Sequence, residues 1–239
     1  IDQRSAYQNF GNAFNLAVRT AKEANVMASL LQFNLSEIPT DAIVTQARLE
    51  VYAYQRSNPS YIWVQTHKMR APWNVTQVSW INAYNSHPWQ VAGAAGAADR
   101  DPVYSDRKAV ELVDTWYRFD VTDMAQEWVR SPAQNYGVML WATGETYTQY
   151  DFVSSDNGEY AGQHPKLVVS YWVPNGPLPT NTPPPTSTAT RTATPTPRPA
   201  TPTATPAPAT PTATPRPATA TATSAPATAT ATWTADPTA

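Results

Sequence analysis

The stretch LEVYAYQRSNPSYIWVQT, residues 49–66, contains two short segments in which apolar side chains recur at every second position. Leu49 and Val51 mark the first segment, and Ile62 and Val64 mark the second. Alternation with a period of two is typical of a β-strand that buries one face. The Ser-Asn-Pro-Ser between the segments supplies turn residues. This stretch therefore predicts two half-buried strands joined by a turn.

The same alternation recurs on both sides of this stretch. Loops rich in Asn, Pro, Gly and Ser separate the segments that carry it. Further strands are expected at Phe14–Val18, Met27–Phe33, Trp116–Val121, Val138–Ala142, Asp151–Ser154 and Leu167–Val173. Eight or more short strands with such loops predict an all-β sandwich.

A single short helix is expected after Asp120 or Thr122. Apolar residues there recur at helical spacing, and Pro132 is expected to end the helix because proline cannot continue it. The apolar face consists of Met124, Ala125, Trp128 and Val129. Elsewhere, Gly11 and Gly137 each follow an Asn-aromatic pair and are expected to adopt a positive φ.

Proline divides the chain into two parts. Of 24 prolines, seven precede Pro174 and the rest lie at or after it, where Leu178 and Trp233 are the only large apolar residues. Residues 1–173 are long enough to bury a substantial core, whereas the tail cannot form one. We expect a sandwich domain over 1–173 and a Thr/Pro/Ala-rich tail over 174–239 with a polyproline II-like conformation.

Charge and cysteine content exclude several classes of protein. The formal net charge is −2 without clustered Lys and Arg, so no nucleic-acid partner is expected. No run of 18 apolar residues occurs, so no membrane span is expected. Cysteine is absent. The chain starts at Ile1, as a mature secreted protein would, and an extracellular or cell-surface location is expected.

The sequence carries no recognisable catalytic motif. His67, His87 and His164 lack partners at metal-binding spacing, and no nucleophile elbow, phosphate loop or dinucleotide fingerprint is present. We therefore expect no enzymatic activity and no cofactor.

An acidic loop allows two interpretations. Asp151, Asp156 and Glu159 supply oxygen ligands of the kind that a structural Ca²⁺ prefers. The favoured alternative is an ordinary turn built on Asn157 and Gly158.

Aromatic side chains at loop or strand-edge positions are candidates for stacking on sugar rings. Most aromatic residues in such a domain will instead form the core, where each buries a large area. The carbohydrate-binding candidates are Tyr61, Trp63, Tyr84, Trp89, Tyr104, Tyr147 and Tyr160.

The tail contains a nine-residue repeat. PRPATPTAT begins at Pro197, and related nonamers begin at Pro206, Pro215 and Ser224. Nine residues make three turns of a polyproline II helix, so equivalent threonines return to the same side. This composition is typical of O-glycosylated stalks, with an unmodified linker as the alternative. The candidate O-glycosylation sites are Thr186, Thr188, Thr190, Thr192, Thr194, Thr196, Thr201, Thr203, Thr205, Thr210, Thr212, Thr214, Thr219, Thr221, Thr223, Thr228, Thr230 and Thr232.

The end of the tail alternates small and β-branched residues from Ala227 to Ala235 and includes the aromatic Trp233. Such a segment can add as a strand to the open sheet edge of another subunit, with Trp233 as an assembly anchor. More tail, with an incidental Trp233, is the alternative. Extended as polyproline II at about 3.1 Å per residue, the tail would reach on the order of 200 Å and run along several neighbours, which predicts a head-to-tail homopolymer.

Several framework motifs resemble the DNRLRE-type extracellular domain. They include SLLQFNLS at residues 29–36, WNVTQVSW at 73–80, FDVT at 119–122, NYG at 135–137 and PKLVVSY at 165–171. The resemblance implies a jelly-roll-like sandwich found in secreted and surface proteins, some of which act as carbohydrate-binding modules. Asn74 and Val75 stand where the family commonly has an acidic residue.

Three functional hypotheses follow from these features. The leading one is a non-enzymatic structural subunit of an extracellular filament, with the glycosylated tail running along its neighbours. The first alternative is a carbohydrate-binding module on a glycosylated stalk, with a polysaccharide as its partner. The second is a fragment of a larger surface enzyme.

Overall fold

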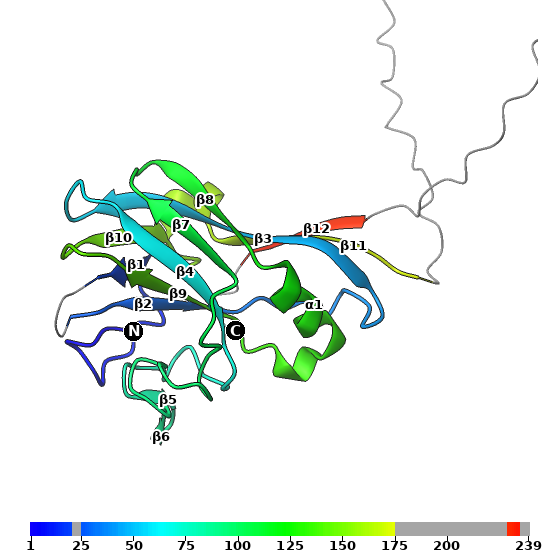
Figure 1. Cartoon of the computed structure of the whole chain (residues 1–239), viewed down its shortest axis with the longest axis horizontal. Coiled ribbons are helices and arrows are strands. Elements are labelled where there is room, and N and C mark those ends of the chain that lie inside the picture. The colour runs from blue at the N-terminus through cyan, green and yellow to red at the C-terminus, as the bar shows by residue number, and fades with distance from the viewer. Residues whose placement is uncertain (21–24, 175–228, 235–239) are drawn as a thin grey trace, which may run out of the picture. The chain divides into compact units, whose positions relative to one another are not determined.

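The computed structural model describes residues 1–20, 25–174 and 229–234, and its strands form two packed antiparallel sheets (Figure 1). In the first sheet the order is β1-β10-β3-β11-β12, with β8 also paired to β3. Its strands are β1 (Asn15–Arg19), β3 (Ile43–Arg56), β8 (Thr115–Asp120), β10 (Gln149–Val153), β11 (Lys166–Trp172) and β12 (Ala229–Thr234).

The second sheet has four strands in the order β2-β9-β4-β7. They are β2 (Ala28–Leu31), β4 (Ile62–Lys68), β7 (Asp106–Val110) and β9 (Val138–Thr143). A small hairpin of β5 (Asn82–Tyr84) and β6 (His87–Pro88) lies apart from both sheets. The expected all-β sandwich is confirmed.

The core lies between the two sheets and is organised around β3. Leu49 and Val51 are fully buried, and Leu49 pairs with Phe119 of β8 on one side and Leu167 of β11 on the other. On the facing sheet, Ile62 and Val64 of β4 are also fully buried. The period-two pattern of residues 49–66 therefore identifies the core face of both sheets.

The helix α1 (Thr122–Arg130) lies at one end of the sandwich, beside β3 (Figure 1). Its buried residues are the four predicted ones, Met124, Ala125, Trp128 and Val129, and it ends before Pro132. Two short 3₁₀ helices, Pro132–Gln134 and Gly158–Gln163, follow α1 in the chain.

A second apolar cluster covers part of the outer face of the second sheet. Residues 69–94 fold back over β2 and β9 and bury Met139 and Ala28. The cluster consists of Ala28, Met69, Val78, Ala83, Trp89, Ala94 and Met139. Trp63 lies farther along β4, outside this cluster, and is only partly buried.

The two predicted positive-φ glycines differ from each other. Gly137 has φ +81°, as expected, and a Cβ there would lie 2.1 Å from the carbonyl oxygen of Leu31. The prediction for Gly11 is wrong, because Gly11 is not in the positive-φ region. Glycine is required there by close approach, since a Cβ would lie 2.2 Å from the carbonyl oxygen of Val75.

Two local features depart from the sequence-based expectation. Strand β7, with sequence DRKAV, was not predicted because it is mostly charged; it forms an edge of its sheet, where such residues are common. Phe14 precedes β1 and is 68% exposed, so it does not continue the buried alternation of that strand.

Residues 229–234 form the outermost strand beside β11. Six residue pairs define the antiparallel register, from Lys166 opposite Thr234 to Tyr171 opposite Ala229. This end of the tail therefore joins the sheet of the domain that begins at residue 1, although it lies beyond the expected boundary at residue 173.

Candidate functional site

An aromatic and polar cluster lies on the outer face of β4. Because side chains alternate along a strand, Trp63, Gln65 and His67 lie on the face opposite the core residues Ile62 and Val64. We call the group formed by Tyr61, Trp63, Gln65, Tyr104 and Arg107 the β4–β7 platform.

The platform aromatics make defined ring contacts. The rings of Tyr61 and Trp63 are perpendicular, with centroids 6.1 Å apart. The guanidinium carbon of Arg107 lies 4.5 Å from the Trp63 ring centroid and 5.6 Å from that of Tyr104. Tyr61 is 54% exposed and Tyr104 is 39% exposed. The cluster therefore presents apolar ring surface beside a cation on an open face.

Strand register holds the polar members in place. Gln65 pairs with Arg107 on β7 and with Trp141 on β9, and Trp63 pairs with Ala109 and Thr143. The side chains beside Trp63 in the sheet are small, and the guanidinium of Arg107 covers part of its ring. Gln65 and Arg107 add amide and guanidinium groups, which suit hydroxyl-rich ligands.

His67 is a buried residue on the same face of β4, beside Gln65 and Tyr104. Its Nδ1 is 2.9 Å from the carbonyl oxygen of Asp101, and its Nε2 is 3.2 Å from Oε1 of Gln65. A neutral imidazole donates to only one of these two oxygens. The ring also packs edge-on against Tyr104. Burial lowers the pKa of His67, and the charge of Arg100 lowers it further. A neutral His67 therefore supports Gln65 and Tyr104 at neutral pH.

The seven predicted aromatic residues do not form one site. Tyr61, Trp63 and Tyr104 meet on the platform. Trp89 is only 5% exposed and donates its indole N–H to the carbonyl oxygen of Ser79, so it belongs to the second apolar cluster. The prediction that Trp89 stacks on a sugar ring at the surface is therefore wrong.

The other three candidates lie in separate places. Tyr84 stacks on His87 in the β5–β6 hairpin, with ring centroids 4.3 Å apart. Tyr147 lies 5.5 Å from the guanidinium of Arg19, and Tyr160 packs on Tyr54. None has a ring contact with a platform residue.

Two platform residues, Gln65 and Arg107, were not predicted from the sequence. The alternation along β4 could have identified Gln65, because a residue between two core positions of a strand lies on the same outer face as Trp63. No comparable signal identified Arg107, because β7 itself was not predicted.

The acidic residues do not assemble a metal site. Asp151 is buried, and its Oδ1 accepts hydrogen bonds from Asn15 and Gln149. The described residues hold no group of three or more His, Cys, Asp or Glu placed to share a metal ion. Asn157 instead accepts a hydrogen bond from the backbone N–H of Tyr160, in keeping with the turn interpretation of the acidic loop.

A polar groove of about 470 Å³ lies beside α1. Its lining includes Lys68, Arg70, Glu127, Arg130 and Tyr136. Lys68 forms ion pairs with Glu127 and Asp101. Burial alone would lower the pKa of Lys68, but the hydrogen bonds to these carboxylates outweigh it and raise the pKa. The charge of Lys68 in the groove is therefore paired with carboxylates.

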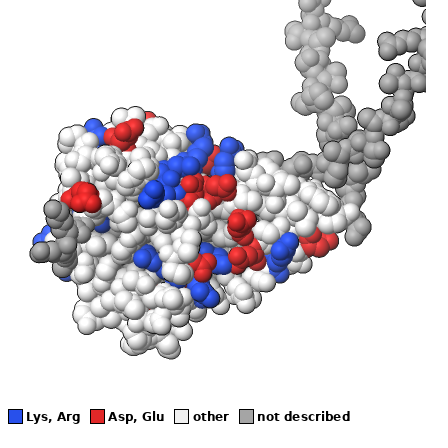
Figure 2. All heavy atoms as spheres, in the orientation of Figure 1, with Lys and Arg blue, Asp and Glu red and all other residues white. Residues whose placement is uncertain are grey.

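Charges of both signs are interspersed over the visible face of the domain (Figure 2). This distribution fits the small net charge of −2. A surface of mixed sign lacks the continuous basic patch that polyanion binding by charge alone requires.

The tail candidates fall into two groups. Thr186 to Thr228 lie outside the described residues, whereas Thr230 and Thr232 lie in β12. Trp233 is also in β12, at the register position opposite Leu167.

The comparisons agree with a binding domain of this kind. The model of carbohydrate-binding module family 96 matches residues 1–171, which include both sheets apart from the end of β11 and β12, and the whole platform. No curated protein matches the sequence significantly. The helices within the described ranges are all too short or too polar to cross a membrane. The match covers most of the chain, and the chain belongs to carbohydrate-binding module family 96.

Proposed function

We propose that this protein is a non-catalytic carbohydrate-binding module that holds a polysaccharide chain across the β4–β7 platform. The observation that carries the proposal is the grouping of Trp63 and Tyr104 around Arg107, with Tyr61 against Trp63, on one sheet face. Membership of a carbohydrate-binding family supports the same function. The expected filament role has no comparable support.

The platform has the two properties that sugar binding requires. Aromatic rings offer flat apolar surface for the C–H faces of pyranose rings, and few conformations are lost on binding because each ring has only two side-chain torsions. Gln65 and Arg107 provide hydrogen-bond donors at the edge of that surface. A guanidinium donates to hydroxyls and to carboxylates, so both neutral and acidic polysaccharides are candidate ligands.

The test is affinity electrophoresis of the full chain in gels containing neutral or acidic polysaccharides, followed by calorimetry with oligosaccharides of the retained type. Trp63→Ala should weaken binding at least ~30-fold, because loss of a central aromatic contact costs about 2 kcal/mol or more. Arg107→Ala should also weaken binding. Tyr147→Ala is the matched control, since Tyr147 is 51% exposed but lies outside the platform.

Variants in the polar groove locate the site independently. Arg130→Ala changes an exposed groove residue and should leave binding unchanged. If Arg130→Ala weakened binding and Trp63→Ala did not, the ligand would bind in the groove and the platform assignment would be wrong. If no polysaccharide retarded the unmodified protein, the proposed function itself would fail.

Two further elements complete the proposed role. We propose an extracellular or cell-surface location, which the Thr/Pro/Ala composition of the tail supports because it suits O-glycosylation. Assembly into a filament is a second candidate, and the one observation that bears on it is the pairing of residues 229–234 with the edge of β11 within a single chain.

A further inference from the structure

The outer edge of β11 is a strand-binding surface. One edge of β11 pairs with β3, and the other pairs with residues 229–234 through six consecutive positions. Among the described strands, β12 is the partner of that outer edge. Without β12, the edge would expose a row of backbone donors and acceptors, which is a template for another strand.

The connection between the paired strands is far longer than pairing within one chain requires. Antiparallel neighbours are usually joined by two to five residues. Here β11 ends at Trp172 and β12 begins at Ala229, although Tyr171 and Ala229 are opposite each other in the register. The intervening chain would reach on the order of 180 Å if fully extended. A domain of this size is about 40 Å across.

We propose that the β11 edge accepts residues 229–234 of a second copy of this chain. Backbone pairing recognises an extended segment and a register, and both are identical whether the segment comes from the same chain or another. The reach of the connection places the edge of a neighbouring copy within range. The donor segment and the acceptor edge are different surfaces, so the contact is head-to-tail and can extend beyond a dimer.

Pairing within one chain competes with pairing between chains. Tethering gives the chain's own segment a high effective concentration, so a dilute solution favours the pairing within one chain. The fraction of exchanged strands should therefore rise with protein concentration. This inference is independent of the proposed sugar-binding function, because the platform lies on the other sheet.

A cysteine cross-link between two distinguishable chains tests the proposal. The protein has no cysteine, so each introduced thiol is unique. Ser170 and Thr230 are Cα partners in the register, and directly opposed antiparallel residues are about 4.5–5.5 Å apart at Cα, within disulfide range. Full-length Ser170→Cys and affinity-tagged Thr230→Cys should be mixed at increasing concentration, oxidised, and resolved by non-reducing electrophoresis.

The expected result is a heterodimer whose yield rises with concentration and exceeds that of a collision control. The control mixture pairs Thr230→Cys with Leu112→Cys, which places a thiol at an exposed loop position away from β11. The double variant Ser170→Cys/Thr230→Cys shows whether the register forms at all. A cross-link within single chains, without heterodimer above the control, would overturn the proposal, and so would the absence of any cross-link.

A second variant removes the pairing without cysteine. Ala231→Pro deletes one backbone donor in the middle of β12, whereas Ala231→Ser keeps it. Sedimentation velocity over a range of concentrations should show oligomers for the unmodified chain and Ala231→Ser but not for Ala231→Pro. Equal oligomer content in all three would contradict strand exchange. Sugar binding should be unchanged in both variants, which separates this inference from the proposed function.

Discussion

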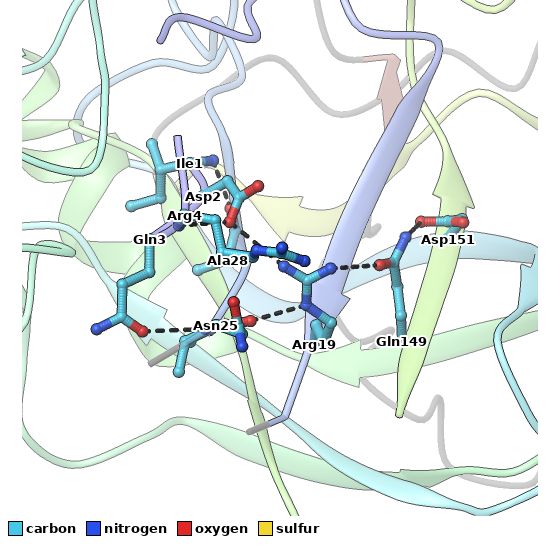
Figure 3. Close-up of polar contacts among 10 residues, drawn as sticks. Ile1, Asp2, Gln3, Arg4, Arg19, Asn25, Ala28, Gln149 and Asp151 are labelled. Atoms are coloured by element: carbon cyan, nitrogen blue, oxygen red, sulfur yellow. Dashed lines mark hydrogen bonds and ion pairs between the residues drawn. The ribbon is translucent and has the colours of Figure 1, made fainter. Parts of the chain in front are cut away.

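Arg19 shows how single polar residues join the start of the chain to the sandwich. Its guanidinium donates to Asp2, to the backbone carbonyl of Asn25 and to the side chain of Gln149 (Figure 3). Gln149 in turn donates to Asp151, 2.7 Å away. Because Arg19 and Asp2 are both largely buried, losing one partner would leave a charge without compensation. This network therefore fixes the N-terminal segment against β1 and β10.

Asp151 gives a pH-dependent prediction at this scale. Burial raises the pKa of its carboxyl, and the hydrogen bonds from Gln149 and Asn15 oppose the shift only in part. The folded state therefore retains a proton that the unfolded state releases near the ordinary carboxyl pKa of about 3.9. The contribution of Asp151 to stability is complete below that pH and is lost as the pH rises through its raised folded pKa.

Asp151→Asn removes the free-energy cost of ionising a buried carboxyl group at neutral pH. The amide oxygen can still accept both hydrogen bonds. We expect the thermal midpoint of the variant to be slightly higher than that of the unmodified protein at pH 7, and the difference to shrink towards pH 3. Differential scanning calorimetry over that range measures it. Asp41→Asn, at an exposed position, is the control and should show no such trend. A lower midpoint for Asp151→Asn at pH 7 would mean that the carboxylate charge stabilises the network.

At the scale of elements, Thr122 links the start of α1 to the centre of the first sheet. Its Oγ1 accepts a hydrogen bond from the backbone N–H of Ala47 at 3.0 Å and donates to Asp120 at 2.6 Å. Ala47 is fully buried in β3. The helix therefore starts at a position where its first side chain satisfies a buried backbone donor.

Thr122→Val keeps the shape of the side chain and removes the acceptor. We expect a loss of about 1–3 kcal/mol in the free energy of unfolding, because the N–H of Ala47 would remain buried without a partner. Each kcal/mol corresponds to about 2–4 °C in the thermal midpoint for a domain of this size. Thr122→Ser keeps the hydroxyl and should lose much less. Equal losses for both variants, measured by urea unfolding, would assign the effect to the methyl group.

The elements also show what the sequence can and cannot predict. Segments with a buried face, such as β3, β4 and α1, were recognisable because their periodicity reflects the core directly. Strand β7 was not, because an edge strand rich in charged residues has no apolar alternation. The aromatic residues of the platform were therefore predictable, whereas Arg107 was not, because it lies on the unpredicted strand β7. The grouping itself depends on strand register, which local patterns do not determine.

At the scale of the whole molecule, the two sheets carry different proposed roles. The second sheet presents the platform at its β7 edge, whereas the first offers the outer edge of β11 to a strand. Variants that affect one sheet surface should therefore leave the other function intact. The same fold can serve a binding module and an assembling subunit, because the two surfaces share no residue.

The tail provides the last prediction, which concerns its proposed glycans. A Thr/Pro-rich composition like that of the repeat is typical of O-glycosylated segments. Trypsin cleaves after Arg191 but not at Arg198 or Arg216, which precede proline, so residues 192–239 all lie in the same tryptic peptide. In protein from the native host, we expect this peptide to be heavier than its sequence mass by multiples of sugar residues.

Mass spectrometry of the same peptide from a host without O-glycosylation gives the unmodified reference. Peptides from residues 1–173 serve as an internal control and should carry no hexose series on threonine. Electron-transfer fragmentation then assigns the modified threonines, and sites spaced by nine residues would match the period of the repeat. An unmodified native peptide would show that the tail is a bare connection, and the reach of β12 would then depend on proline content alone.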